Sequence, residues 1–191
     1  MEFAVIDVET SNQNPASICQ VGIACFSKGR LVRTWETLIN PGDSFLSFNT
    51  QLHGIGPSAV THSPTWIEVQ SDLRDLLEGC ILASHTYFDR GAMNGANLRY
   101  GVKLISVADW LDTCQIARRA WPHLPNHKLT SLARTFGIFY EEHNAVEDAR
   151  CAGEILIMAA RSTGLSLEQL SRAKSPREFK SAGAPHSKSS L

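Results

Sequence analysis

The pattern of apolar and polar residues predicts a chain that begins with buried strands and then alternates between strands and helices. Residues 3–8 are apolar at almost every position, which is typical of a central strand covered on both faces. Residues 18–26 and 31–39 predict two further strands. Because the connection between them, residues 27–30, is short enough for a hairpin, we expect at least one antiparallel pair.

Shorter apolar runs at residues 81–83 and 103–107 predict a fourth and a fifth strand. Residues 41–64 are rich in glycine and proline, so we expect a loop there with at most short helical turns. Helices are expected at residues 65–77, 86–100, 109–120, 128–136, 145–162 and 166–171. The order of these elements predicts an α/β fold with one mixed sheet and helices on both faces.

The composition changes at residue 173, where large apolar residues almost end. Residues 173–191 contain five serines, three lysines and two prolines, a composition typical of disorder. We therefore expect one domain over residues 1–172 and a disordered, basic, serine-rich tail over residues 173–191. The basic bias of this tail would suit a polyanion, but a solvated tail explains it more simply.

Charge and cysteine content narrow the class of protein. The 191 residues are 43% hydrophobic with a net charge of −1, which indicates a soluble globular protein without an overall attraction to nucleic acid. No apolar stretch approaches the ~20 residues of a transmembrane helix, and no charged leader precedes the first strand, so we expect no membrane partner. The five cysteines are scattered and form no CxxC pair, which favours reduced core thiols in a cytoplasmic protein.

Two carboxylates, Asp7 and Glu9, stand at the end of the first predicted strand. Both point to the same side, because successive side chains of a strand alternate between faces. Ligands of open α/β sheets bind at the C-terminal ends of strands, and paired anions there require a cation. Carboxylates without a nearby thiolate suit Mg²⁺ or Mn²⁺. The plainer alternative is a pair of solvent-facing acids.

A further acid, Asp89, follows the short strand at residues 81–83. If Thr86 caps the next helix, Asp89 takes its third position and is explained as a capping-box acid. A site residue is the other interpretation, because this helix starts at the C-terminal end of a strand that we expect beside Asp7 in a parallel arrangement.

A histidine and an acid frame the start of the helix predicted at residues 145–162. Asn144 is a suitable N-cap, and Glu147 completes a capping box. This places His143 and Asp148 side by side at a helix N-terminus, where an anion or phosphate is also favoured. Taken alone, His143 is more simply explained as a surface histidine.

Together, these positions resemble the motifs of the DEDDh exonucleases, over about residues 3–170. The three matching segments are Phe3–Thr10, His85–Asp89, and His143 with Asp148 five residues later. Residues 111–113 and 128–133 fit the family as well, and residues 117–122 are similar to a segment of exonuclease X. The family commonly has asparagine where this chain has Thr86. The resemblance implies a ribonuclease-H-like sheet with strand order 3-2-1-4-5 and strand 2 antiparallel.

The resemblance also implies a metal-dependent 3′→5′ exonuclease that acts on single-stranded DNA or overhangs and releases nucleoside 5′-monophosphates, with roles in DNA replication or repair. The metal ligands would be Asp7, Glu9, Asp89 and Asp148. They would hold two divalent ions, Mg²⁺ or Mn²⁺, with Asp7 shared between both. Glu9 and Asp148 would help to hold the ion on the side of the attacking water. Asp89 would serve the ion near the leaving oxygen.

His143 is expected to act as the general base, because the pKa of a histidine, ~6.5, lies close to the working pH. Expected substrate contacts are Thr10, His85 and Phe88. Tyr87 and Trp121 are further aromatic candidates for stacking on bases. For each of these side chains, packing within the protein is the plainer explanation. The same holds for the basic residues 118–128.

Other functions remain open. An exoribonuclease of the same family keeps the chemistry and changes the sugar, and a non-catalytic module accessory to a polymerase keeps only the fold. A phosphatase or receiver domain would need a lysine late in the sheet, for which Lys103 is a poor candidate. Residues 53–56 lack the third glycine and the preceding strand of a phosphate-binding loop. A homodimer or a polymerase partner is expected only by analogy.

Overall fold

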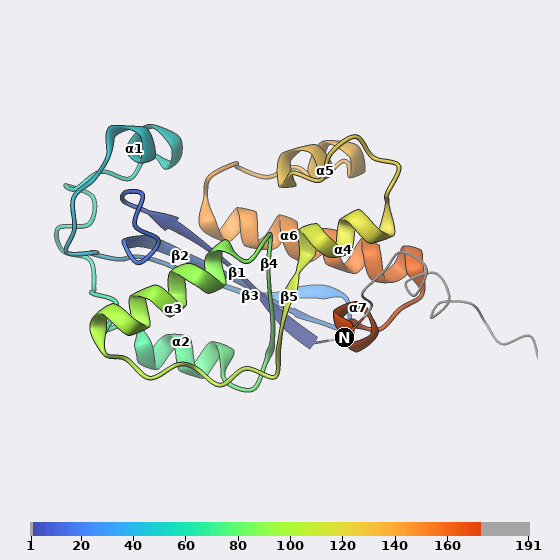
Figure 1. Ribbon diagram of the computed structural model, residues 1–191, viewed down its shortest axis with the longest axis horizontal. Coiled ribbons are helices and arrows are strands. Elements are labelled where there is room, and N and C mark those ends of the chain that lie inside the picture. The colour runs from blue at the N-terminus through green and yellow to red at the C-terminus, as the bar shows by residue number, and fades with distance from the viewer. Residues whose placement is uncertain (1, 173–191) are drawn as a thin grey trace, which may run out of the picture.

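A mixed five-stranded sheet forms the centre of the structure, a computed structural model that describes residues 2–172 (Figure 1). The strands are β1 (Glu2–Thr10), β2 (Ile18–Ser27), β3 (Arg30–Leu38), β4 (Ile81–Ser84) and β5 (Asp109–Asp112). They lie in the order β3-β2-β1-β4-β5. Strand β2 is antiparallel to β1 and β3, whereas β4 and β5 run parallel to β1. This arrangement confirms the expected ribonuclease-H-like fold; the predicted tail lies outside the described residues.

Helices cover both faces of this sheet, as the sequence predicts. They are α1 (Ser47–His53), α2 (Gln70–Leu77), α3 (Phe88–Tyr100), α4 (Thr113–Ala120), α5 (Leu129–Phe136), α6 (Ala145–Thr163) and α7 (Leu167–Arg172). Buried side chains of α2 and α3 pack on one face, and those of α4, α6 and α7 pack on the other. Within residues 2–172, no helix has the length and apolar character that a membrane crossing requires.

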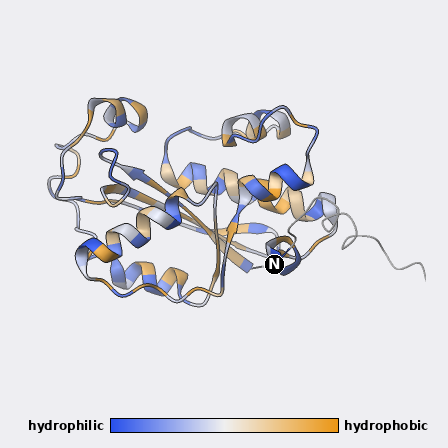
Figure 2. Cartoon of the chain, viewed as in Figure 1, coloured by the Kyte–Doolittle hydropathy of each residue, from blue (hydrophilic) through white to orange (hydrophobic). Residues whose placement is uncertain are grey.

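Strand β1 is central because both of its faces are buried. Phe3 and Val5 belong to the core beneath α6, whereas Ala4, Ile6 and Val8 belong to the core beneath α2 and α3. Figure 2 shows the result, with hydrophobic colour concentrated in the central strands and hydrophilic colour on outward turns of the helices. Alternation along one strand therefore supplies both cores and leaves the polar end of β1 free for other chemistry.

The fifth strand lies at Asp109–Asp112 and not at residues 103–107, where the sequence predicted it. A strand covered on both faces must send side chains to both cores, and Leu111 and Trp110 do so. In residues 103–107 the partly buried side chains reach one core only, and Leu104 is exposed. The helix predicted at 109–120 is shortened accordingly to α4, which Asp112 caps by accepting the N–H of Gln115 at 2.8 Å.

Helices α2 and α3 also begin later than predicted. Before α2, residues 65–69 form turns in which the Glu68 carboxylate accepts the N–H of Thr65 at 2.7 Å. Before α3, Thr86 has a left-handed φ of 97°, and the N-cap position falls on Tyr87. A β-branched residue rarely adopts such a φ, so Thr86 marks a strained turn between β4 and α3.

Two glycines let α6 lie directly against the sheet. A Cβ at Gly22 on β2 would stand 2.2 Å from the backbone carbon of Ala145, and a Cβ at Gly153 would stand 2.2 Å from the ring of Phe26. Gly22 is paired with Asp7 in the sheet register. The missing side chain at Gly22 therefore brings the N-terminus of α6 close to the acidic end of β1.

Candidate active site

Acidic side chains from distant parts of the chain meet at the C-terminal end of β1. Oxygen and nitrogen atoms of Glu9, His143 and Asp148 lie within 4.8 Å of one another. Asp7 and Asp89 adjoin this group closely enough that the carboxylates raise one another's pKa. The structure thus brings together all the acids and the histidine that the sequence singled out.

Asp89 joins α3 to the central strand. Its carboxylate accepts the backbone N–H of Val8 at 3.1 Å, and its side chain is almost fully buried. Because the N-cap is Tyr87, Asp89 occupies the second helical position and the capping-box interpretation is wrong. This hydrogen bond instead holds Asp89 beside β1, at Val8, the residue between Asp7 and Glu9.

The start of α6 follows the sequence prediction in part. The side chain of Asn144 caps the helix by accepting the N–H of Glu147 at 3.4 Å. The second half of the predicted capping box is absent, because the Glu147 carboxylate binds Arg150. Asp148 lies one position further, buried and directed at the acidic end of β1, and His143 lies before the cap with an exposed side chain.

Burial and mutual repulsion keep protons on these acids. Burial, together with the charges of Asp148 and Asp89, raises the pKa of Glu9 to about 8. Burial is the main cause that raises the pKa of Asp89 to about 7 and the pKa of Asp148 to about 7. The pKa of Asp7 lies well above its ordinary value, through burial first and the neighbouring carboxylates second. The cluster therefore resists holding its full negative charge unaided.

No lysine or arginine neutralises the cluster among the residues that the structure describes. The ion pairs found there are Arg99–Asp43, Arg150–Glu147, Arg150–Glu154 and Arg172–Glu168. Carboxylate oxygens with one imidazole and no thiolate form a donor set that fits a hard divalent cation. The donor set is thus compatible with a divalent metal ion: Glu9, His143 and Asp148 lie close enough together to hold one, with the acids Asp7 and Asp89 beside them.

Helix α1 covers the end of β1, which sequence reasoning missed. The carbonyl oxygen of Thr10 accepts a hydrogen bond from Nδ2 of Asn49 at 2.8 Å and lies 3.2 Å from Nε2 of His53. Because Nδ1 of His53 accepts the N–H of Ile55, Nε2 carries the proton and donates to Thr10. Burial, and to a smaller extent the charge of His143, lowers the pKa of His53. Through its bond to Thr10, the residue after Glu9, the ring adjoins the acidic end of β1. In the sequence, His53 stood out only as the first residue of the glycine-containing segment 53–56, which does not fit a phosphate-binding loop.

The predicted substrate contacts occupy different environments. Phe88 is 48% exposed at the start of α3, whereas the side chain of Thr10 is buried. His85 has both ring nitrogens engaged: Nε2 lies 3.0 Å from the carbonyl oxygen of His127, and Nδ1 lies 2.9 Å from the Thr113 hydroxyl. Because a carbonyl only accepts, Nε2 must donate and Nδ1 accepts. His85 therefore links β4 to α4 and to the segment before α5.

The other aromatic candidates divide between packing and exposure. Trp121 packs on Phe136 with ring centroids 4.4 Å apart, and its carbonyl lies 3.0 Å from Nε2 of His127. Tyr87 is 52% exposed, and the guanidinium of Arg90 lies over its ring. Among these candidates, Tyr87 and Phe88 thus keep exposed rings at the start of α3.

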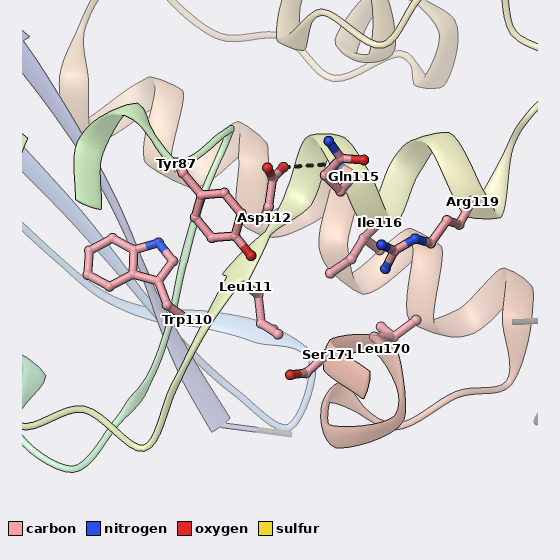
Figure 3. Close-up of a pocket in the computed structure, with 9 residues that line it drawn as sticks. All are labelled: Tyr87, Trp110, Leu111, Asp112, Gln115, Ile116, Arg119, Leu170 and Ser171. Atoms are coloured by element: carbon pink, nitrogen blue, oxygen red, sulfur yellow. Dashed lines mark hydrogen bonds between the residues drawn. The ribbon is translucent and has the colours of Figure 1, made fainter. Parts of the chain in front are cut away.

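A pocket of about 380 Å³ lies on the outer side of β5, apart from the acid cluster (Figure 3). It opens between Tyr87 and Trp110 on one side and Arg119 on the other. The acid in its wall, Asp112, is engaged as the cap of α4. Trp110 donates to the hydroxyl of Ser84 at 3.0 Å. The pocket contains none of the predicted metal ligands, so concavity alone would have indicated the wrong place.

Comparison with known proteins places this arrangement in context. The model of a family described as exonuclease (RNase T) matches residues 4–156. The PolC-type DNA polymerase III of Caldanaerobacter subterraneus subsp. tengcongensis is 34% identical over 161 residues, which cover 82% of this chain and 11% of that polymerase. The PolC-type DNA polymerase III of Streptococcus agalactiae is 29% identical over 160 residues, with the same coverage. The chain thus spans about a tenth of the length of these relatives.

Solved structures share the fold at low sequence identity. Exonuclease X in complex with 5′ overhanging duplex DNA has a TM-score of 0.69 at 19% identity, over 88% of this chain and 97% of that one. The nuclease domain of 3′hExo, a DEDDh family member bound to rAMP, has a TM-score of 0.71 at 17% identity, over 84% and 92%. Escherichia coli exonuclease I with a dA16 oligonucleotide has a TM-score of 0.73 at 15% identity, over 94% and 42%.

Proposed function

The chain belongs to the exonuclease family, and on this premise we propose that it hydrolyses phosphodiester bonds at the 3′ ends of single-stranded DNA or of overhangs. The observation that carries the proposal is the convergence of Glu9, His143 and Asp148 within 4.8 Å, beside the further acids Asp7 and Asp89. Residues 1–172 would form the exonuclease domain. Each round would release one nucleoside 5′-monophosphate.

The acids would hold two divalent cations, Mg²⁺ or Mn²⁺, with Asp7 shared between them. Bound there, these ions would supply the positive charge that an anionic phosphodiester needs for attack and for departure of its leaving oxygen. Buried carboxylates with raised pKa values, which no lysine or arginine of residues 2–172 compensates, support this assignment. A non-catalytic module would have no need to keep such an unfavourable cluster.

His143 would take the proton of the attacking water. Its side chain is exposed and lies beside the Asp148 carboxylate, which stabilises the imidazolium that forms. Water oxygen would bond to phosphorus as the bond to the leaving 3′ oxygen breaks. That oxygen would regain a proton from solvent. A ligand role for His143 is the competing assignment, since its ring belongs to the same cluster.

The strand end would reach the acids between α1 and the start of α3. Phe88, half exposed next to Asp89, is placed to stack on a base. Thr10 and His85 would act through the fold that they hold, because the carbonyl oxygen of Thr10 and both ring nitrogens of His85 are engaged within the protein. We propose DNA over RNA as the substrate because the relatives are DNA polymerases, and a polymerase as the partner on the same ground.

Magnesium-dependent digestion of a 3′-labelled DNA oligomer tests the proposal. The wild-type protein should release labelled mononucleotide, and Asp7→Ala should reduce the rate by at least ~10³-fold. Asp72→Ala, an exposed acid of α2, is the matched control and should leave the rate unchanged. Equal digestion by Asp7→Ala and wild type would overturn the assignment. Equal rates on matched DNA and RNA oligomers would overturn the preference for DNA.

A further inference from the structure

The loop that carries His143 is held to α6 by Arg150. This loop, residues 137–144, joins α5 to α6. Nη2 of Arg150 donates to the carbonyl oxygen of Phe139 at 2.6 Å. The same guanidinium binds the carboxylate of Glu147 at 2.7 Å and that of Glu154 at 2.6 Å. One side chain of the helix thus ties the preceding loop to the helix surface.

The two carboxylates hold the guanidinium rigid. Charge-assisted bonds are stronger than neutral ones, and the planar fork of arginine fixes their directions. The Arg150 side chain is only 19% exposed, which limits competition from water. The loop backbone is therefore attached at Phe139, shortly before His143.

His143 depends on its backbone for orientation. Its φ of 63° is left-handed, a conformation that is uncommon for residues other than glycine. No hydrogen bond of the His143 ring is found within residues 2–172, where the side chain is exposed. Because no side-chain contact of this kind fixes the ring, its position follows from the loop that precedes it.

We propose that Arg150 is a positioning residue for His143, which it acts on through the backbone of residues 139–143. The inference rests on the proposed role of His143 as the base. A displacement of ~1 Å at a catalytic group can cost ~10²-fold in rate, so the anchor of the loop has kinetic consequences. Arg150 does not serve as a phosphate contact, because Nε, Nη1 and Nη2 all bind acceptors of the protein.

A double-mutant cycle on the full chain tests the proposal. Steady-state kcat and KM on a 3′-labelled DNA oligomer with Mg²⁺ are measured for the wild type, Arg150→Gln, His143→Ala and the double variant. We expect Arg150→Gln to lower kcat by ~10- to 10²-fold with KM changed less than ~2-fold. In the His143→Ala background, Arg150→Gln should lower kcat hardly any further, because the imidazole that Arg150 positions is already absent. Arg161→Gln, at the far end of α6, is the matched control.

Each outcome decides the matter. Equal losses from Arg150→Gln with and without His143 would overturn the positioning role, as would a loss confined to KM. His143→Ala without effect would overturn the proposed base, a separate failure. If circular dichroism shows that Arg150→Gln is unfolded, Arg150→Lys is used in its place. Lysine keeps the positive charge but lacks the planar, forked donor group of arginine. Arg150→Lys should still lower kcat at least ~5-fold while retaining the Mn²⁺-induced thermal shift; full activity of this variant would refute the proposal.

Discussion

At the scale of single residues, the unusual feature is a set of carboxylates whose pKa values are raised together. Glu9 titrates at about 8, and Asp89 and Asp148 at about 7, against ~4 in an unfolded chain. Between these values the folded protein binds more protons than the unfolded one. Its stability is therefore greatest below pH ~4 as far as these groups are concerned, and it falls as the pH rises toward 8.

We expect the metal-free protein to lose thermal stability between pH 5 and about 8, and Mn²⁺ to restore it most at the upper end. Metal ions displace the protons, so the apparent affinity for Mn²⁺ should rise over the same range. Differential scanning fluorimetry at several pH values, with EDTA or with Mn²⁺, measures both effects. A metal-induced shift in Tm that is independent of pH would contradict the assignment.

His143→Ala should lower the single-turnover rate by ~10²–10⁴-fold if the imidazole accepts the proton of the attacking water. Affinity for Mn²⁺, measured by calorimetry, should change by no more than about twofold, because the carboxylates remain. The opposite pattern, a large loss of Mn²⁺ affinity with a matching loss of rate at low metal only, would make His143 a ligand.

At the scale of elements, the site depends on how closely α6 approaches β2. Gly22→Ala places a methyl group 2.2 Å from backbone atoms that cannot rotate away, so the start of α6 must shift. We expect a loss of about 1–3 kcal/mol in the free energy of unfolding and a larger proportional loss of exonuclease rate. Urea denaturation and the oligomer assay measure the two quantities.

Gly91→Ala is the control for this substitution. A Cβ at Gly91, on the exposed side of α3, meets no atom within 4 Å. Alanine favours a helix over glycine by roughly 0.5–1 kcal/mol, so this variant should be slightly more stable than the wild type. Similar destabilisation by both alanines would show that the contact at Gly22 is unimportant.

At the scale of the whole molecule, the sheet and every predicted ligand lie within residues 2–172. Removal of residues 173–191 should therefore leave kcat and KM on a short DNA oligomer within about twofold at ~0.1 M salt. If the lysines of this tail hold the substrate, KM would instead rise on truncation and would lose part of its dependence on salt. A salt series on both proteins separates these results.

Much of this architecture is predictable from the order of residues because the signals are local. The buried run before Asp7 indicates the central strand, and Asn144 indicates the start of α6. The position of β5 was not predictable in this way, since residues 103–107 are as apolar as a strand and only packing against the two cores excludes them. The bond between Asp89 and Val8 was missed because helix capping explains an acid at that place equally well.

Metal ions held at the acidic cluster would also link catalysis to the stability of the protein. A divalent ion that binds the folded chain alone stabilises it by mass action, by about 2.7 kcal/mol at a hundred times its dissociation constant. Without the ion this stabilisation would be lost, and a larger unfolded fraction would be open to proteolysis. Nutritional supply of a single inorganic ion would then govern how fast each molecule works and also how many molecules survive.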